Sequence, residues 1–139
     1  MTGRGEAFDA WLSGDIPRMV RALSLDAQPV DRHFLLMTLC RLAYGQRKAD
    51  PEMRRLATDI GLLHIREFPL LREPLRRDIG MLPGVPTFAH VATLLAEAGD
   101  HAGAIRVCEE AIAHGLSDGT KGDYPGRIAR LRKAMALEP

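Results

Sequence analysis

The chain of 139 residues has few cysteines and few aromatic residues. Its two cysteines, Cys40 and Cys108, lie far apart within apolar, helix-like runs, which excludes a disulfide framework and a CxxC metal or redox motif. We expect two reduced, buried thiols. Aromatic residues make up 5% of the chain, too few for the stacking platforms on which many proteins bind single-stranded nucleic acid.

Long apolar runs are also missing. The longest are FLLM at 34–37 and IGLLHI at 60–65, and both are far shorter than the roughly 20 apolar residues that a transmembrane helix needs. The first ten residues contain no apolar core of a signal peptide. The sequence therefore predicts no membrane segment, and a cytoplasmic location follows by default.

Neither sign of charge dominates, because 19 basic and 18 acidic residues give a net charge of +1. Such a balance favours neither nucleic acid nor anionic lipid as a partner. The distribution is less even: 41–55 and the segment from 124 onward are basic, whereas 97–123 is acidic. This pattern is typical of solvated helix faces, and it leaves open a polarised surface that steers a charged partner. The candidate basic patch comprises Arg41, Arg47, Lys48, Arg54, Arg55, Arg127 and Arg130.

Sequence motifs for catalysis or metal binding are absent. No pair of the five histidines has HxxxH or HExxH spacing, and no cysteine lies near enough to a histidine in sequence to suggest a zinc site. We expect His64 to be half-buried in its helix and His101 and His114 to lie at the surface. The three serines lack the context of a nucleophile elbow, and the neighbouring acids Glu109 and Glu110 are expected on a solvated face. We therefore predict no catalytic residue, no metal site and no cofactor, and a protein that is not an enzyme.

One glycine-rich loop, GLSDGTKGDYPGR at 115–127, raises the question of phosphate binding. A P-loop has the order GxxxxGK[ST] and follows a strand, whereas GTK here follows a helix-like run. We interpret the loop as a connector in which Gly115 ends one helix and Asp123 caps the next, with Gly119 and Gly122 permitting tight turns. Lys121 leaves anion binding open.

Apolar residues recur at helical spacing almost throughout, and no stretch alternates as a strand would, so the sequence predicts an all-α fold. Asp15 and Asp50 are the expected N-caps of two helices, each followed by a proline in the first turn. The dipeptide at 68–69, Phe-Pro, is expected to end the helix that begins after Asp50. The expected helices are 6–12, 16–25, 29–44, 51–67, 70–79, 85–97, 101–114 and 124–137.

The most regular segment is VPTFAHVATLLAEAGDHAGAIRVCEEAIAHGL at 85–116. Its first helical run carries Phe88, Val91, Ala92 and Leu95, its second carries Ala104, Cys108 and Ala111, and AGD separates the two. This segment resembles a tetratricopeptide repeat, a 34-residue unit of two antiparallel helices. Leu116 stands where that family places a proline, which puts standard packing of the next helix in doubt.

The resemblance implies a single domain at 1–139, a short α-solenoid of stacked antiparallel hairpins. Its parts are an N-terminal helical pair at 1–28, a degenerate repeat at 29–69, a short helix and linker at 70–84, a clear repeat at 85–118 and a capping helix at 119–139. The chain also resembles a group of small bacterial and phage proteins through three stretches, LPGVPTF, GLSDGTKG and GRIARL. This resemblance covers most of the chain and implies no activity.

The same resemblance implies a function in protein interaction. In the repeat family the first helices of successive repeats line a concave groove, and the corresponding positions here are Pro86, Ala89, Thr93 and Ala96. These small residues favour a peptide or helix docked by apolar contact, or self-association into a homo-oligomer. The alternative is a small helical protein that uses the basic patch on nucleic acid through phosphate contacts alone.

Overall fold

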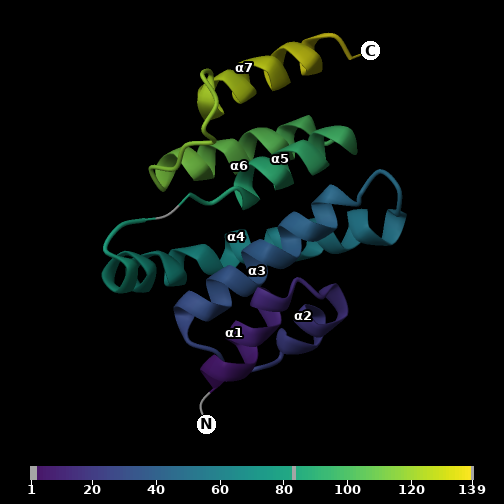
Figure 1. Cartoon of the computed structure of the whole chain (residues 1–139). Helices are drawn as coiled ribbons and strands as arrows, with labels where there is room; N and C mark the ends of the chain where they lie inside the picture. Colours follow the sequence, from purple (N-terminus) through teal and green to yellow (C-terminus); the bar gives the residue numbers. More distant parts are fainter. Residues whose placement is uncertain (1–2, 83, 139) are drawn as a thin grey trace. The chain divides into compact units, whose positions relative to one another are not determined.

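The computed structural model describes residues 3–82 and 84–138, and in these ranges it contains seven helices and no strand (Figure 1). The prediction of an all-α fold is confirmed. The chain folds into two compact units, Met1–Pro83 and Gly84–Pro139, and the boundary between them in the sequence falls within the Gly/Pro-rich segment 80–86. The helices are α1 (Gly3–Ser13), α2 (Ile16–Ala22), α3 (Pro29–Gly45), α4 (Pro51–Ile79), α5 (Thr87–Glu97), α6 (His101–Ala113) and α7 (Asp123–Ala136).

Two helices, α2 and α4, start at the capping residues that the sequence predicts. The Asp15 carboxylate accepts a hydrogen bond from the amide of Arg18 at 3.3 Å, and α2 begins directly after it. The Asp50 carboxylate accepts one from the amide of Glu52 at 2.9 Å at the start of α4. Each bond satisfies a backbone donor that has no partner within its own helix, which fixes where the helix begins.

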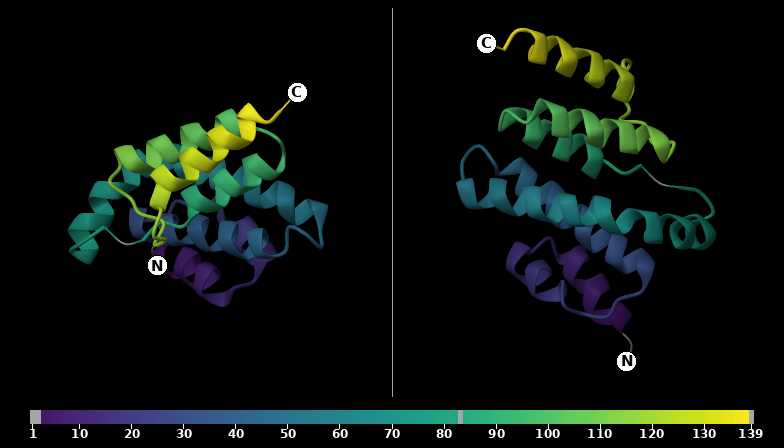
Figure 2. Two further views of the ribbon diagram at one scale, coloured as in Figure 1. Left: turned by 90° about the horizontal axis from the view of Figure 1, so that it is seen from above. Right: turned by 180° about the vertical axis from the view of Figure 1, so that it is seen from behind.

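In the first unit, α3 lies between α4 on one side and α1 with α2 on the other (Figures 1 and 2). The buried core of this unit brings together side chains from α1, α2, α3 and α4, because the middle helix presents apolar residues to all three neighbours. These core residues are Ala10, Met19, Ala22, Leu35, Leu36, Leu39, Cys40 and Ile60.

The prediction that Phe-Pro ends the helix after Asp50 is wrong, because α4 continues through Pro69 and Pro74 to Ile79. A proline inside a helix loses one backbone hydrogen bond and costs about 3 kcal/mol. Here Phe68, Leu71 and Leu75 extend the buried stripe of α4, whereas Pro69 is exposed. Burial of each large apolar side chain contributes about 1.5–3 kcal/mol, so packing outweighs the local preference of the prolines.

The second unit is an α5–α6 hairpin with α7 packed along α6 (Figure 2). The turn falls at the predicted AGD, and the Asp100 carboxylate caps α6 by accepting from the Gly103 amide at 2.8 Å. Most of the residues predicted to pack in the hairpin are buried, and Leu95 is half-buried. The buried ones are Phe88, Val91, Ala92, Ala104, Cys108 and Ala111.

Helix α6 ends at the glycine that the sequence predicts. Gly115 has a φ of 76°, in the left-handed region where a side chain is strained. The amides of Gly115 and Leu116 donate to the carbonyls of Ile112 and Ala111 at 2.9 and 3.0 Å, which is the Schellman pattern. Leu116, at the position of the expected proline, is buried and helps to close this end of the hairpin.

Candidate functional site

A groove in the second unit lies between α5 and α7 and encloses about 210 Å³. Helix α5 contributes small side chains and one acid to its lining, and α7 contributes two guanidinium groups and one leucine. We call this site the α5–α7 groove. Its lining residues are Ala92, Thr93, Ala96, Glu97, Arg127, Arg130 and Leu131.

The structure brings together some of the predicted groove residues with some of the predicted basic residues. Thr93 and Ala96 line the groove, as do Arg127 and Arg130. Pro86 and Ala89 are half-buried near the start of α5 and do not line it. The resemblance to the repeat family placed all four residues on one groove face, but the groove forms only where α7 comes alongside α5.

Arg127 is fixed in place by the loop that precedes α7. Its Nε donates to the Asp118 carboxylate at 2.5 Å, and its Nη1 lies 3.4 Å from the Thr93 hydroxyl on α5. The Asp118 side chain is fully enclosed, and 25% of the Arg127 side chain is exposed. Arg127 therefore joins the loop, α5 and α7, and its charge is matched by Asp118 before any ligand binds.

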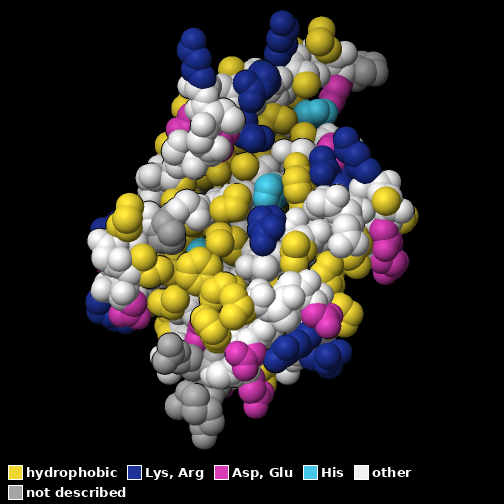
Figure 3. Space-filling view, viewed as in Figure 1, with side chains coloured by type: hydrophobic (Ala, Val, Ile, Leu, Met, Phe, Trp, Pro, Cys, Tyr) yellow, Lys and Arg dark blue, Asp and Glu magenta, His cyan; other side chains and the backbone are white. Residues whose placement is uncertain are grey.

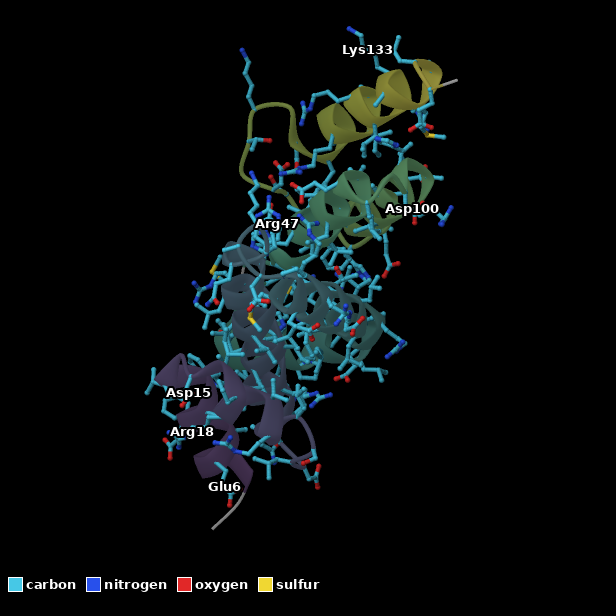
Figure 4. The ribbon with its side chains drawn as sticks, turned by 90° about the vertical axis from the view of Figure 1, so that its right-hand side faces the viewer. Glu6, Asp15, Arg18, Arg47, Asp100 and Lys133 are labelled. Carbon is cyan, nitrogen blue, oxygen red and sulfur yellow. The ribbon has the colours of Figure 1, made fainter. Side chains whose placement is uncertain are left out.

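Arg130 differs from Arg127 because its guanidinium makes no ion pair among the described residues. It is exposed, and its Nη1 lies back along α7 near Gly122 and Gly126. Figure 3 shows Lys and Arg side chains gathered over α7 and the loop before it, and Figure 4 shows Lys133 projecting from α7 away from α6. The α7 side of the groove is therefore electropositive.

The glycine-rich loop 115–127 satisfies much of its own backbone. The Thr120 amide and hydroxyl donate to the Asp118 carboxylate at 2.9 and 2.6 Å, and the amides of Asp118 and Tyr124 donate to the Asp123 carboxylate at 2.9 and 2.8 Å. The Asp123 amide donates to the Thr120 hydroxyl at 3.1 Å. A phosphate cradle needs free amide donors, and these are already occupied.

Two details of the loop differ from the prediction. Gly122, with a φ of −78°, occupies the N-cap position of α7, and Asp123 is the first residue of the helix with a φ of +53°. Asp123 adopts this rare conformation for a residue with a side chain because its carboxylate bonds two amides of the loop. Lys121 is exposed, as expected of a solvated side chain.

Ionisation of Asp118 supports the fixed position of Arg127. Burial opposes ionisation of this carboxyl group, but hydrogen bonds from Thr120 and Arg127 outweigh that effect and lower its pKa to about 2. Nearby, burial raises the pKa of the Cys108 thiol and of the Tyr124 phenol. Both groups are therefore neutral near pH 7, and the Tyr124 hydroxyl is buried with no hydrogen-bond partner in the described part of the chain.

The remaining residues of the predicted basic patch lie in the first unit, at the end of α3, in the following loop and at the start of α4. Arg41, Lys48 and Arg55 are exposed, and Arg55 pairs with Glu52. Arg47 stacks over the Tyr44 ring, with its guanidinium carbon 3.9 Å from the ring centroid. Arg54 is half-buried. Part of this positive charge is thus already engaged by neighbouring side chains.

The first unit contains a buried histidine pair that sequence spacing did not reveal. His64 Nε2 lies 2.9 Å from His33 Nδ1, and both residues are buried, with His33 0% and His64 1% exposed. The prediction that His64 is half-buried is therefore wrong. So is the surface position predicted for His101 and His114, whose side chains are 19% and 13% exposed and lie beside Glu138 and Glu110.

Antiparallel packing of α3 against α4 explains the histidine pair. The Cys40 thiol lies 3.5 Å from the Ala57 carbonyl, so these two residues face each other across the helix pair. His33 precedes Cys40 and His64 follows Ala57 by the same seven residues, about two helical turns. The signal in the sequence is that both histidines lie on buried stripes, but their register becomes visible only once the helices are paired.

Both histidines of the pair are neutral near pH 7. Burial lowers the pKa of His33 to about 4, and burial together with the charges of His33 and Arg32 lowers that of His64 to about 3. His33 Nε2 has no hydrogen-bond partner among the residues that the structure describes. Arg32 is held beside the pair by two bonds to the Glu67 carboxylate at 2.9 and 2.7 Å. Burial likewise raises the pKa of the Cys40 thiol to about 12.

A second cavity, of about 340 Å³, lies between α1 and α2. Its charged lining consists of Glu6 and Asp9 from α1 and Arg18 and Arg21 from α2. Figure 4 labels Glu6 and Arg18 on these two helices. Because the two carboxylates balance the two guanidinium groups, this cavity does not select the sign of charge of a ligand.

Comparisons with protein families, with curated proteins and with solved structures found no match to this chain. None of the helices among the described residues combines the length and the hydropathy that crossing a bilayer requires. Within those same residues, no three His, Cys, Asp or Glu side chains converge on a point where they would hold a metal ion.

Proposed function

We propose that the chain is a protein-interaction module that binds a peptide segment in the α5–α7 groove. The observation that carries this proposal is the groove itself, with the small side chains of Ala92 and Ala96 on one wall and Leu131 on the other. Pockets for small molecules and cofactors usually enclose about 300–1,000 Å³. A groove of about 210 Å³ suits instead one bulky side chain of a docked segment.

The resemblance of the α5–α6 hairpin to a tetratricopeptide repeat supports the proposal. In that family the groove is lined by the first helices of successive repeats. By this resemblance α5 is one such helix and α7 takes the place of the next. The predicted contact residues Thr93 and Ala96 line the groove, which is the expected location for a bound peptide or helix.

Selection of peptides from a random displayed library would test the proposal. We expect that enriched peptides bind the wild-type chain and shift the nuclear magnetic resonance signals of Ala92, Thr93 and Ala96. Replacement Ala96→Gln fills the groove and should weaken binding by about tenfold or more, since it removes the space for the anchoring side chain. Ala113→Gln, at an exposed position of α6, is the matched control and should leave binding unchanged.

Two results would contradict this function. One is selection of peptides whose binding is equally strong in the Ala96→Gln variant, because the groove would then not be the binding site. The other is failure to enrich any peptide while the chain forms a stable homodimer through the same groove. In that case self-association, rather than capture of another protein, is what this surface does.

A further inference from the structure

We infer that the α5–α7 groove selects an acidic segment, in which a carboxylate pairs with Arg130 while a neighbouring apolar side chain fills the groove. This inference rests on the proposed function and names the chemistry of its ligand. It follows from a difference between the two guanidinium groups of the groove: Arg127 pairs with Asp118, whereas Arg130 has no anionic partner within 3–82 and 84–138.

Arg127 does not offer a free charge to a ligand. Its guanidinium donates to the enclosed Asp118 carboxylate and reaches the Thr93 hydroxyl. The Thr120 amide and hydroxyl bind the other oxygen of Asp118. Asp118 and Thr120 therefore hold Arg127 as a fixed wall of the groove, and this is the role that we assign to the glycine-rich loop.

Arg130 lies one turn further along α7 than Arg127. It lines the same groove, is exposed, and makes no ion pair among the residues that the structure describes. Glu97, the acid in the lining, has an interaction of its own. Arginine binds carboxylates with two parallel hydrogen bonds. A carboxylate at this edge of the groove would therefore accept hydrogen bonds from the guanidinium donors of Arg130.

The surroundings of Arg130 define the rest of the ligand. Ala92, Ala96 and Leu131 offer an apolar surface directly beside Arg130. Arg132 and Lys133 follow on the exposed part of α7 and extend the positive field beyond the groove. The complementary segment therefore carries one bulky apolar residue flanked by Asp or Glu, and charge attraction would accelerate its encounter with the groove.

Defined peptide pools can test the inference. Three pools of short fluorescent peptides share a central leucine, which is flanked by Asp or Glu in the first pool, by Asn or Gln in the second and by Lys or Arg in the third. We expect the acidic pool to bind about tenfold more tightly than the neutral pool at low salt, because a charge-assisted contact contributes about 1.5 kcal/mol or more. The basic pool should bind most weakly.

Paired variants of α7 locate the effect. Arg130→Gln should reduce binding of the acidic pool to the level of the neutral pool, whereas Arg132→Gln, an equal loss of charge outside the groove, should leave most of the preference intact. Both residues are exposed, so neither change should disturb folding. An equal effect of the two variants would overturn the inference, because the preference would then come from the general field of α7.

The outcomes separate this inference from the proposed function. Equal binding of the acidic and neutral pools, with shifted signals of Thr93 and Ala96, would refute the acidic ligand and leave the groove function standing. Absence of any binding and of any shifted signal would refute both. Tighter binding of a short DNA duplex that displaces the acidic pool and is lost in Arg130→Gln would replace the peptide with nucleic acid.

Discussion

Acidification should destabilise the first unit through its buried histidine pair. A histidine in the unfolded chain has a pKa of about 6.5, whereas burial lowers the pKa of His33 to about 4 and that of His64 to about 3. Below about pH 6.5 the unfolded chain therefore binds two protons that the folded unit rejects. The stabilisation is complete above that pH and is lost progressively as the pH falls towards the folded values.

The size of this effect can be worked from the same pKa values. Each pKa unit corresponds to about 1.4 kcal/mol, so at about pH 5 each histidine costs about 2 kcal/mol and the pair about 4 kcal/mol. A unit of this length has a total stability on the order of 4–12 kcal/mol. The first unit should therefore lose a large share of its stability while the pH is still well above the pKa of ordinary carboxyl groups.

Urea unfolding at about pH 7.5 and about pH 5, followed by the fluorescence of Trp11, measures this loss in the correct unit. Trp11 is the single tryptophan of the chain, and its indole nitrogen donates to Asp31 of α3 at 3.3 Å. Its signal therefore reports on the packing of α1 against α3.

A double variant isolates the contribution of the pair. The double variant carries His33→Asn and His64→Gln. Each imidazole ring is thus replaced by a side-chain amide, which can form hydrogen bonds but does not titrate. The variant should show a much smaller change of the urea midpoint between the two pH values, whatever its stability at pH 7.5. The reasoning is refuted if the wild-type midpoint is the same at both pH values, or if the double variant loses as much as the wild type.

Three further substitutions test individual statements about the fold. Pro69→Ala should raise the stability of the first unit by about 1–2 kcal/mol in urea unfolding, because it restores a helical hydrogen bond at an exposed position; an unchanged or lower midpoint would show that the proline is needed. Asp100→Ala should lower the thermal stability of the second unit by about 1 kcal/mol through loss of the α6 cap, and Asp100→Ser should recover most of it. Lys121→Ala should change stability by less than about 0.5 kcal/mol, and a larger loss would mean that this exposed lysine has a structural partner.

Local chemistry accounts for the parts of the fold that the sequence predicted. The predicted caps at Asp15 and Asp50 depend on a carboxylate and an amide two or three residues apart, so they are readable without any tertiary contact. The same holds for the end of α6 at Gly115, where the left-handed backbone favours glycine. The all-α fold and the apolar faces of the α5–α6 hairpin follow from helical periodicity.

Packing between helices decided what local rules could not. Pro69 predicts a helix end, yet the buried side chains of Phe68, Leu71 and Leu75 keep α4 continuous, because their burial offsets the cost of the two prolines inside the helix. The histidine pair depends on the register between α3 and α4, which spacing within a single helix does not contain.

The candidate site divides in the same way. The sequence by itself determined that Thr93 and Ala96 share a face of α5 and that α7 is basic, because each property belongs to a single helix. Only the tertiary structure placed Arg127 and Arg130 beside that face and matched Arg127 with Asp118, while Arg130 makes no ion pair among the described residues. The physical reason is that a helix fixes its own faces through backbone geometry, whereas the partner of each face is chosen by packing and by the loops that join the helices.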